Sequence, residues 1–103
     1  MLPIDVSPAA AGQIRAADDW WRLHRPKAPN AIREDLERAS LLISFQPQAG
    51  ALARNVSLPG VRRIHLARIR YDLYFRVADS PPRVEILSFW HASRGEPPPL
   101  ADL

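Results

Sequence analysis

The chain has 103 residues, the size of one small domain, and 47% of them are hydrophobic, which is enough for a modest core. It contains no cysteine, which excludes disulfides and thiolate metal sites, and no run of about 18 apolar residues that would span a membrane. The net charge is +3, and the N-terminus lacks the basic and long apolar segments of a secretory signal, so we expect a cytoplasmic protein.

The first 26 residues predict a short strand followed by a helix. Residues 2–6 alternate apolar and other side chains, with Pro3 at the start of the strand or on a sheet edge. Ser7 and Pro8 are a favourable N-cap and first helical residue. The helix should end before Pro26, because a proline disfavours helical geometry in the residue that precedes it. Its apolar stripe, at helical spacing, is Ala10, Ile14, Ala17 and Trp21.

A second helix and a long loop follow. A tight connector leads to Asn30, a candidate N-cap, and two helices joined by so short a link predict an antiparallel hairpin. Residues 47–60 contain two prolines and two glycines and therefore predict a loop, in which residues 51–54 suit one extra turn of helix. The apolar stripe of the second helix is Ile32, Leu36, Ala39 and Ile43.

The last third of the domain predicts three strands. Alternating patterns indicate strands over residues 61–67, 71–77 and 84–91, and the last is apolar on both faces, which is typical of a strand covered on each side. We expect a single domain over residues 1–95 and a flexible, proline-rich tail over residues 96–103.

The predicted order is therefore β-α-α-β-β-β, an α+β fold. The helical hairpin has one apolar face and should pack on one face of a small, mainly antiparallel sheet. The opposite face of the sheet would then be left to Arg, His and Tyr side chains, or to a partner.

The positive charge is concentrated in the second half of the sequence. Residues 54–94 carry eight arginines against three acidic residues, a net charge of +5, and Lys27 is the only lysine in the chain. Arginine suits planar, bidentate contacts with carboxylate or phosphate. A basic surface of this kind favours an acidic protein segment or a nucleic acid as its partner.

Four segments, taken in order, resemble the ParE branch of the RelE/ParE superfamily of bacterial toxins. The resemblance covers residues 2–95, and no single segment is specific by itself. The segments are "SPAAAGQI" (7–14) at the first helix, "PQAG" (47–50) after the second, "VRRIHLARIRYDLYFRV" (61–77) and the closing "VEILSFWHASR" (84–94).

The resemblance implies a toxin of a type II toxin–antitoxin system, of the kind associated with plasmid stabilisation, neutralised by an antitoxin encoded beside it. The ParE branch is associated with inhibition of DNA gyrase, and we expect this protein to act on gyrase by binding rather than by turnover. The alternative is the RelE branch, which cuts messenger RNA on the ribosome. A third hypothesis is a homologue that has lost its activity and serves only as a binding partner.

A ribonuclease would have to rest on His91, because only histidine titrates near neutral pH without a perturbing environment. Arg94, Arg76 or Arg63 would supply cations around the phosphate. Against this hypothesis, the lysines and late tyrosine of the RelE branch are missing, and Asp72 stands where some nucleases of the superfamily carry a functional arginine. In the structural alternative, His91 caps the strand end and hydrogen-bonds a loop carbonyl.

We expect a larger set of side chains to bind the target or the antitoxin. An unpaired sheet edge would also accept a strand from an antitoxin. The three histidines lack metal-ligand spacing, so we expect no metal and no other cofactor. The expected binding residues are Arg62, Arg63, His65, Arg68, Arg70, Arg76, Trp90, His91, Arg94 and Trp20.

The neighbouring residues Trp20 and Trp21 cannot face the same way, because successive helical residues are about 100° apart. Trp21 continues the apolar stripe of the first helix. Trp20 either packs on the loop at residues 47–60 or anchors a partner, and the sequence favours neither.

Overall fold

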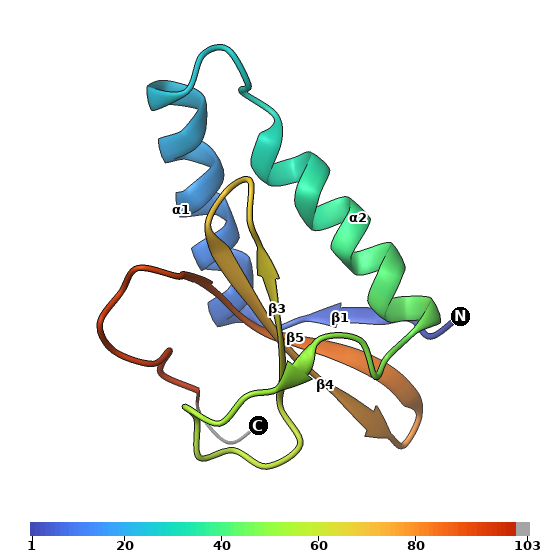
Figure 1. Ribbon diagram of the computed structural model, residues 1–103. Coiled ribbons are helices and arrows are strands. Elements are labelled where there is room, and N and C mark those ends of the chain that lie inside the picture. Colours follow the sequence, from blue (N-terminus) through green and yellow to red (C-terminus); the bar gives the residue numbers. More distant parts are fainter. Residues whose placement is uncertain (101–103) are drawn as a thin grey trace.

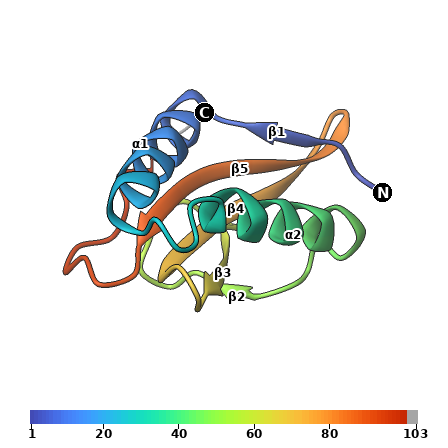
Figure 2. The ribbon, with the colours of Figure 1, turned by 90° about the horizontal axis from the view of Figure 1, so that it is seen from above.

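Two helices lie on one face of a five-stranded sheet (Figures 1 and 2). The computed structural model describes residues 1–100. The strand order across the sheet is β1-β5-β4-β3-β2, with β1 parallel to β5 and every other pair antiparallel. The elements are β1 (Ile4–Val6), α1 (Pro8–His24), α2 (Ala31–Phe45), β2 (Ala51–Leu52), β3 (Arg62–Leu66), β4 (Tyr71–Asp79) and β5 (Pro82–His91).

The helices begin and end close to where the sequence predicts. The Ser7 hydroxyl accepts a hydrogen bond from the backbone N–H of Ala10 at 3.1 Å, and Pro8 is the first helical residue of α1. Asn30 precedes α2, although its side chain makes no capping hydrogen bond. Seen from above, α1 runs beside β5 and α2 crosses in front of β4 (Figure 2). The predicted α+β fold, a helical hairpin on one face of a sheet, is confirmed.

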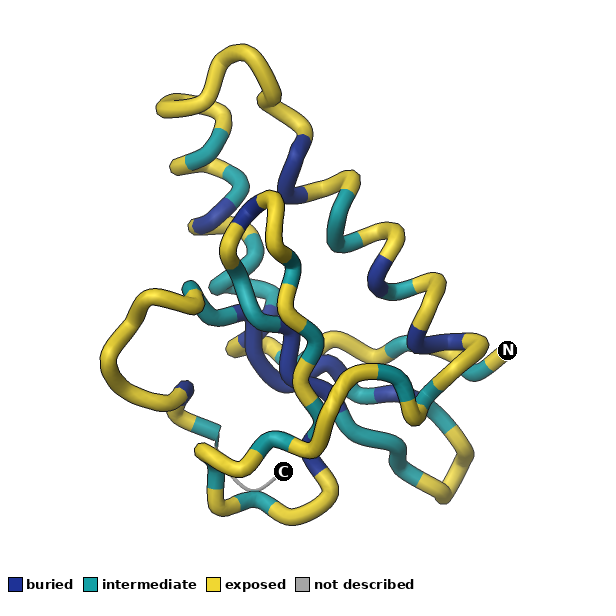
Figure 3. The backbone as a smooth tube through the Cα atoms, viewed as in Figure 1, coloured by how far each residue is buried: buried dark blue, intermediate teal, exposed yellow. Residues whose placement is uncertain are grey.

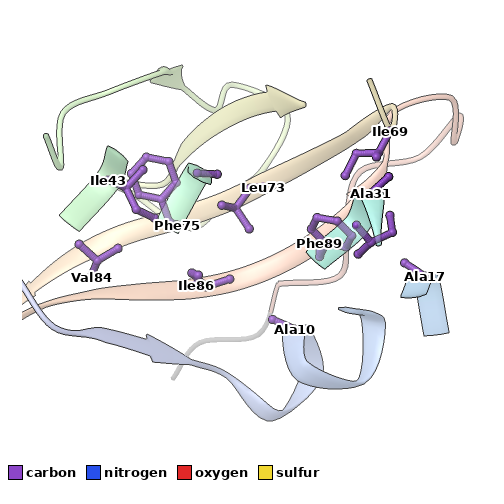
Figure 4. Close-up of a cluster of buried hydrophobic side chains, with 12 residues drawn as sticks. Ala10, Ala17, Ala31, Ile43, Ile69, Leu73, Phe75, Val84, Ile86 and Phe89 are labelled. Atoms are coloured by element: carbon purple, nitrogen blue, oxygen red, sulfur yellow. The ribbon is translucent and has the colours of Figure 1, made fainter. Parts of the chain in front are cut away.

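The main core lies between the helices and the sheet. Its buried side chains come from both helices, from the β3–β4 turn and from β4 and β5, and Figure 4 shows them pointing into one cluster. Figure 3 shows buried stretches on α2 and where β4 and β5 cross the centre of the molecule. The predicted stripes supply these contacts: Ala10 and Ala17 from α1, and Ile32, Ala39 and Ile43 from α2.

A β-bulge interrupts the long β4–β5 ladder. Ser88 pairs with Tyr74 and Ile86 pairs with Phe75, so Leu87 has no opposite residue. The side chain of Gln13 on α1 lies at this point. Its Oε1 accepts hydrogen bonds from the Phe89 N–H at 2.8 Å and the Ser88 hydroxyl at 3.0 Å. The bulge is therefore fixed to the helix that runs along the edge of β5.

The loop after α2 differs from the prediction. Residues 51–52 form the short strand β2, paired with Arg62 and Arg63 of β3, so the predicted helical turn over residues 51–54 is wrong. The observed order is β-α-α-β-β-β-β, one strand more than expected. Two residues are too few to show an alternating pattern, and their strand conformation depends on the neighbouring β3.

The sheet face opposite the helices carries a second, smaller core. Val61, Tyr74 and Leu87 are buried there, and side chains of the loop at residues 53–58 pack against them. Asn55 also donates a hydrogen bond to the Tyr74 hydroxyl at 3.0 Å. The expectation that this face is left to polar side chains or a partner is therefore met in part, since Arg63 and His65 are exposed on β3 while Tyr74 and Leu87 are buried under the loop.

The proline-rich tail expected over residues 96–103 is described as far as Leu100, which packs against the second core. The Trp90 indole N–H also donates to the Glu96 carbonyl at 3.1 Å. The last three residues of the expected tail lie outside the described residues. Among residues 1–100, no helix is both long and apolar enough to span a membrane.

Candidate functional site

A hollow of about 710 Å³ opens where the C-terminal end of α1, the β3–β4 turn and the end of β5 meet. We call it the arginine–tryptophan hollow. In Figure 1 the β3–β4 turn projects between the two helices, which brings it beside α1. The lining residues are Trp20, Trp21 and Arg25 from α1 and its C-cap, residues 68–71 from the turn, and His91 and Arg94 from the end of β5.

The backbone of Arg70 fixes the turn to the end of β5. Arg70 has a left-handed conformation with φ 62°, its N–H donates to the Leu66 carbonyl, and its own carbonyl accepts from the Ala92 N–H, both at 2.8 Å. The side chain of Arg70 is exposed. These two hydrogen bonds place a cation beside His91 and Arg94, more than twenty residues away in the sequence.

Arg68 ties the same turn to α2. Its Nη2 lies 2.6 Å from Oδ1 of Asp35 and 3.0 Å from Oε1 of Glu34, and its Nε lies 3.2 Å from Oδ2 of Asp35. The hydrogen bonds with Asp35, and then those with Glu34, raise the pKa of the Arg68 guanidinium above its ordinary value. The charge of Arg68 is therefore matched by nearby carboxylates.

Arg25 stacks on the two tryptophans of α1. Its guanidinium carbon lies 5.0 Å from the ring centre of Trp20 and 5.8 Å from that of Trp21. The imidazole of His24 stacks on Trp20 at 4.4 Å, and the Trp21 indole N–H donates to the Ala28 carbonyl at 2.8 Å. Trp20 keeps 45% of its surface exposed, and its aromatic contacts are with residues of its own helix and its C-cap.

Tyr71 and His91 line the hollow side by side. Their rings meet edge to face at 5.0 Å, and Tyr71 stacks on Phe89 at 4.5 Å. Burial raises the pKa of the Tyr71 hydroxyl, and the charge of Arg94 opposes this shift. The Ser93 N–H donates to Nδ1 of His91 at 3.2 Å. Because a backbone N–H can only donate, Nδ1 is the acceptor and the proton of a neutral ring lies on Nε2.

Arg94 lies on the aromatic ring of Trp90. Its guanidinium carbon is 4.0 Å from the ring centre, a close cation–π distance. Trp90 itself packs against the second core on the face opposite the helices. Arg94 therefore connects the rim of the hollow to that core.

The hollow is strongly cationic. Within residues 1–100 no carboxylate lines it, and Arg25, Arg70 and Arg94 form no salt bridge with any carboxylate of that range. No group of three or more potential metal ligands occurs among these residues. The arrangement is therefore suited to hold an anion by charged hydrogen bonds.

The structure brings together half of the residues expected to bind a target. Trp20, Arg68, Arg70, His91 and Arg94 line the hollow, and Trp90 supports Arg94.

The other expected binding residues lie elsewhere. Arg62 donates to the carbonyls of Ala49 and Gly50 and so holds the loop after α2. Arg76 pairs with Glu85 at 2.9 Å on the β4–β5 ladder. His65 lies 2.8 Å from Asp72 across β3 and β4, and the last of the four, Arg63, is exposed on β3.

Of the four residues considered for a ribonuclease, only His91 and Arg94 share the hollow. His91 pairs with Tyr71, whereas Arg76 lies five residues further along β4, roughly 17 Å away at the rise of an extended strand. Arg63, on β3, lies opposite Tyr74 of β4. His91 lies at the end of β5, as the structural alternative expects. Its hydrogen bonds are with the N–H and the hydroxyl of Ser93, not with a loop carbonyl.

Four residues of the hollow are not among the predicted binding residues: Trp21, Arg25, Ile69 and Tyr71. Arg25 follows Trp21 by four residues, a helical spacing at which side chains meet, so its stack on the indole was accessible from the sequence. The alternating pattern predicts only that Tyr71 lies in a strand. Its position beside His91 follows from the β4–β5 register, which alternation alone does not define.

A second, more apolar hollow of about 670 Å³ lies between the N-terminal segment and α2. Residues 1–4 form one wall, and Leu41 of α2, with 59% of its surface exposed, lies on the other. It adjoins β1, an edge strand of the sheet. Apolar surface beside a sheet edge is typical of a site for a partner that adds a strand.

The fold is similar to that of two solved bacterial structures. It matches a chain of the chromosomal ParDE toxin–antitoxin system from P. aeruginosa with a TM-score of 0.70 and 24% sequence identity, over 90% of this chain and 98% of that chain. It matches the isolated E. coli RelE toxin with a TM-score of 0.65 and 22% identity, over 93% and 89% of the two chains. These two matches show that the chain shares the fold of these toxin structures.

The family is defined more closely by the sequence. The family model for the ParE toxin of the type II toxin-antitoxin system, parDE, matches residues 4–95. The chain belongs to this ParE toxin family, which confirms the resemblance drawn from the four segments. No curated protein sequence matches the chain.

Proposed function

We propose that this ParE-type toxin inhibits DNA gyrase by binding to it, with the arginine–tryptophan hollow as part of the contact surface. The observation that carries the proposal is the set of guanidiniums in one concavity, Arg25, Arg70 and Arg94, none of which pairs with a carboxylate of residues 1–100. These arginines are exposed in the free protein, and arginines that a partner covers and desolvates at the centre of a contact surface contribute strongly to binding.

Binding rather than turnover is supported by the acid–base groups of the hollow. Phosphodiester cleavage by general acid–base catalysis needs one group to take a proton and another to give one. His91 can do the first, but burial makes the hydroxyl of Tyr71 a weaker acid than usual. The hollow can therefore hold an anion more readily than it can cleave one.

Membership of the ParDE family implies a cognate antitoxin. We propose that the antitoxin adds a strand to the open edge of β1 and covers the apolar hollow beside Leu41. Its acidic residues would also neutralise the arginines. Coexpression with the product of the neighbouring reading frame should raise the solubility and the thermal midpoint of the toxin. A neighbour that does not copurify would contradict this part of the proposal.

The gyrase proposal is tested with the purified toxin in a DNA supercoiling assay. We expect the toxin to inhibit supercoiling and the antitoxin to relieve this inhibition. Induced expression in the bacterial cytoplasm should cause filamentation and an SOS response that depend on gyrase. Full supercoiling at a large excess of folded toxin, with normal growth on induction, would contradict the proposal and favour an inactive homologue.

The second candidate function is a ribosome-dependent ribonuclease. The observation in its favour is the contact of His91 with Tyr71 beside the guanidinium of Arg94. This function predicts arrest of translation and cleavage of transcripts on the ribosome, abolished by His91→Ala. Cleavage of that kind without any effect on supercoiling would replace the gyrase proposal by this one.

A further inference from the structure

We propose that the arginine–tryptophan hollow binds a segment of single-stranded nucleic acid, with its guanidiniums on the phosphates and its aromatic wall against a base. The inference extends the proposed function, because gyrase acts on DNA, and it rests on that function for its biological context. The binding itself requires no gyrase, so the two can be tested separately.

The charge of the hollow fits a polyanion. Arg25, Arg70 and Arg94 enter it from three different segments, and no carboxylate of residues 1–100 lies in its lining. Arg68, in contrast, is matched by Asp35 and Glu34 and contributes little net charge. Three unmatched guanidiniums suit the successive negative charges of a nucleic-acid backbone.

Two of these guanidiniums are held in place before a ligand arrives. Arg25 lies on the indoles of Trp20 and Trp21, and Arg94 lies on the indole of Trp90 at 4.0 Å. A guanidinium stacked on a ring keeps its N–H edge available for a bidentate contact with phosphate oxygens. Because the side chains are already ordered, binding costs less conformational entropy than it would with free arginines.

The aromatic wall favours a nucleic acid over an acidic peptide. Trp20, with 45% of its surface exposed, lines the hollow together with Trp21 and Tyr71. The carboxylates of a peptide need cations but no flat apolar surface, whereas a nucleotide presents a phosphate and a base together. A basic groove interleaved with aromatic side chains is the combination that binds single strands. A volume of about 710 Å³ is ample for one nucleotide.

The experiment is a fluorescence titration of the purified full-length toxin. All three tryptophans, Trp20, Trp21 and Trp90, line the hollow or support Arg94, so the intrinsic fluorescence reports on it directly. The probes are single-stranded oligodeoxythymidine and oligouridine of about 10 nucleotides, a duplex DNA of the same length, and polyglutamate of matched charge. We expect saturable quenching by the single strands, at least about tenfold tighter than by duplex DNA or polyglutamate.

The variants test the role of each part. Arg25→Gln and Arg70→Gln should each weaken strand binding about tenfold and lower the slope of log affinity against log salt by about 0.7. Trp20→Ala should weaken binding by a similar factor through lost stacking. The matched controls are Arg54→Gln, an exposed arginine on the loop after β2, and Leu23→Ala, an exposed apolar residue of α1 outside the hollow.

The outcomes separate cleanly when each variant keeps the circular dichroism spectrum of the parent protein. Equal binding of DNA and RNA strands, or a preference for one of them, supports the inference and identifies the source of the strand. Binding of polyglutamate or duplex DNA as tight as that of the single strands overturns it, as does an effect of the controls equal to that of the hollow variants. Gyrase inhibition without strand binding refutes this inference alone, and strand binding without gyrase inhibition refutes only the proposed function.

Discussion

Arg68 and Asp35 form a two-point contact between the β3–β4 turn and α2, with donor–acceptor distances of 2.6 and 3.2 Å. The Asp35 side chain is only 11% exposed, whereas that of Arg68 is 45% exposed. The contact spans 33 positions of the sequence and holds one wall of the arginine–tryptophan hollow against the helical hairpin. The shape of the hollow therefore depends on an ion pair in which the charge of Arg68 is matched within the protein.

Breaking this pair should loosen the turn. We expect Asp35→Asn and Arg68→Gln each to lower the thermal midpoint, and the double variant to lose less than the sum, because the two side chains act as a unit. The loss should shrink at high salt, since the pair is partly exposed. Thermal unfolding followed by circular dichroism measures it. Glu37→Gln, an exposed carboxylate on the same helix, is the matched control, and an equal effect there would contradict the assignment.

Two glycines offer a matched test of backbone strain. Gly50 (φ 73°) and Gly60 (φ 77°) both have left-handed conformations, but a Cβ on Gly50 would lie 2.7 Å from Ile64 Cγ1, whereas one on Gly60 would meet nothing within 4 Å. Gly60→Ala should cost about 1 kcal/mol from conformation alone. Gly50→Ala should cost at least about 2 kcal/mol, since steric overlap is added. Chemical denaturation measures both, and equal losses would contradict this account.

Gln13 should be important for stability although it does not line the hollow. Its Oε1 is the acceptor for the Phe89 N–H and the Ser88 hydroxyl at the β-bulge. Gln13→Leu leaves both donors without this partner and should cost about 1–3 kcal/mol. Gln13→Glu keeps an acceptor oxygen and should cost less. If denaturation curves rank the two variants in the opposite order, the side chain does not act as an acceptor there.

Glu85 should make folding stability depend on acid pH. The hydrogen bond from Arg76, reinforced by the charge of Arg83, holds the pKa of Glu85 below its ordinary value of 4.5. A lowered pKa in the folded state means that the unfolded state takes up the proton first. The stabilisation is therefore complete above pH 4.5 and is lost as the pH falls through the lowered pKa.

The measurement compares the parent protein with Glu85→Gln by denaturation between neutral and acid pH. We expect the difference in unfolding free energy to shrink as the pH falls below 4.5. In an Arg76→Gln background the same comparison should show a smaller pH dependence. A difference that grows on acidification would mean that the pKa is raised instead.

The sequence was sufficient for the helices and the three long strands because their signals are local. Ser7, Pro8 and Pro26 delimit α1 through backbone chemistry, and the apolar stripes recur at helical spacing. Strand β2 and the bulge at Leu87 were not predictable in the same way, since each exists only through its pairing with a distant segment. The second core has the same origin, because it needs the loop at residues 53–58 to fold over the sheet.

The candidate site was harder to predict, because arginines that look equivalent in the sequence have different partners in the structure. Arg62 and Arg76 are held by loop carbonyls and by Glu85, whereas Arg70 and Arg94 remain unmatched within residues 1–100. Which arginine meets a carboxylate depends on strand register and on the β3–β4 turn, and neither leaves a pattern in composition. Arg25 is the exception, because its four-residue spacing from Trp21 was available from the start.

The parallel pairing of β1 with β5 has a consequence for how the molecule is made. A ribosome synthesises β1 first and its sheet neighbour β5 last among the strands of residues 1–100, so residues 4–6 wait for this partner until residue 86 has been translated. His91 and Arg94 arrive even later. A nascent chain therefore lacks both the finished sheet and the full set of cations of the hollow until residue 94 has been translated.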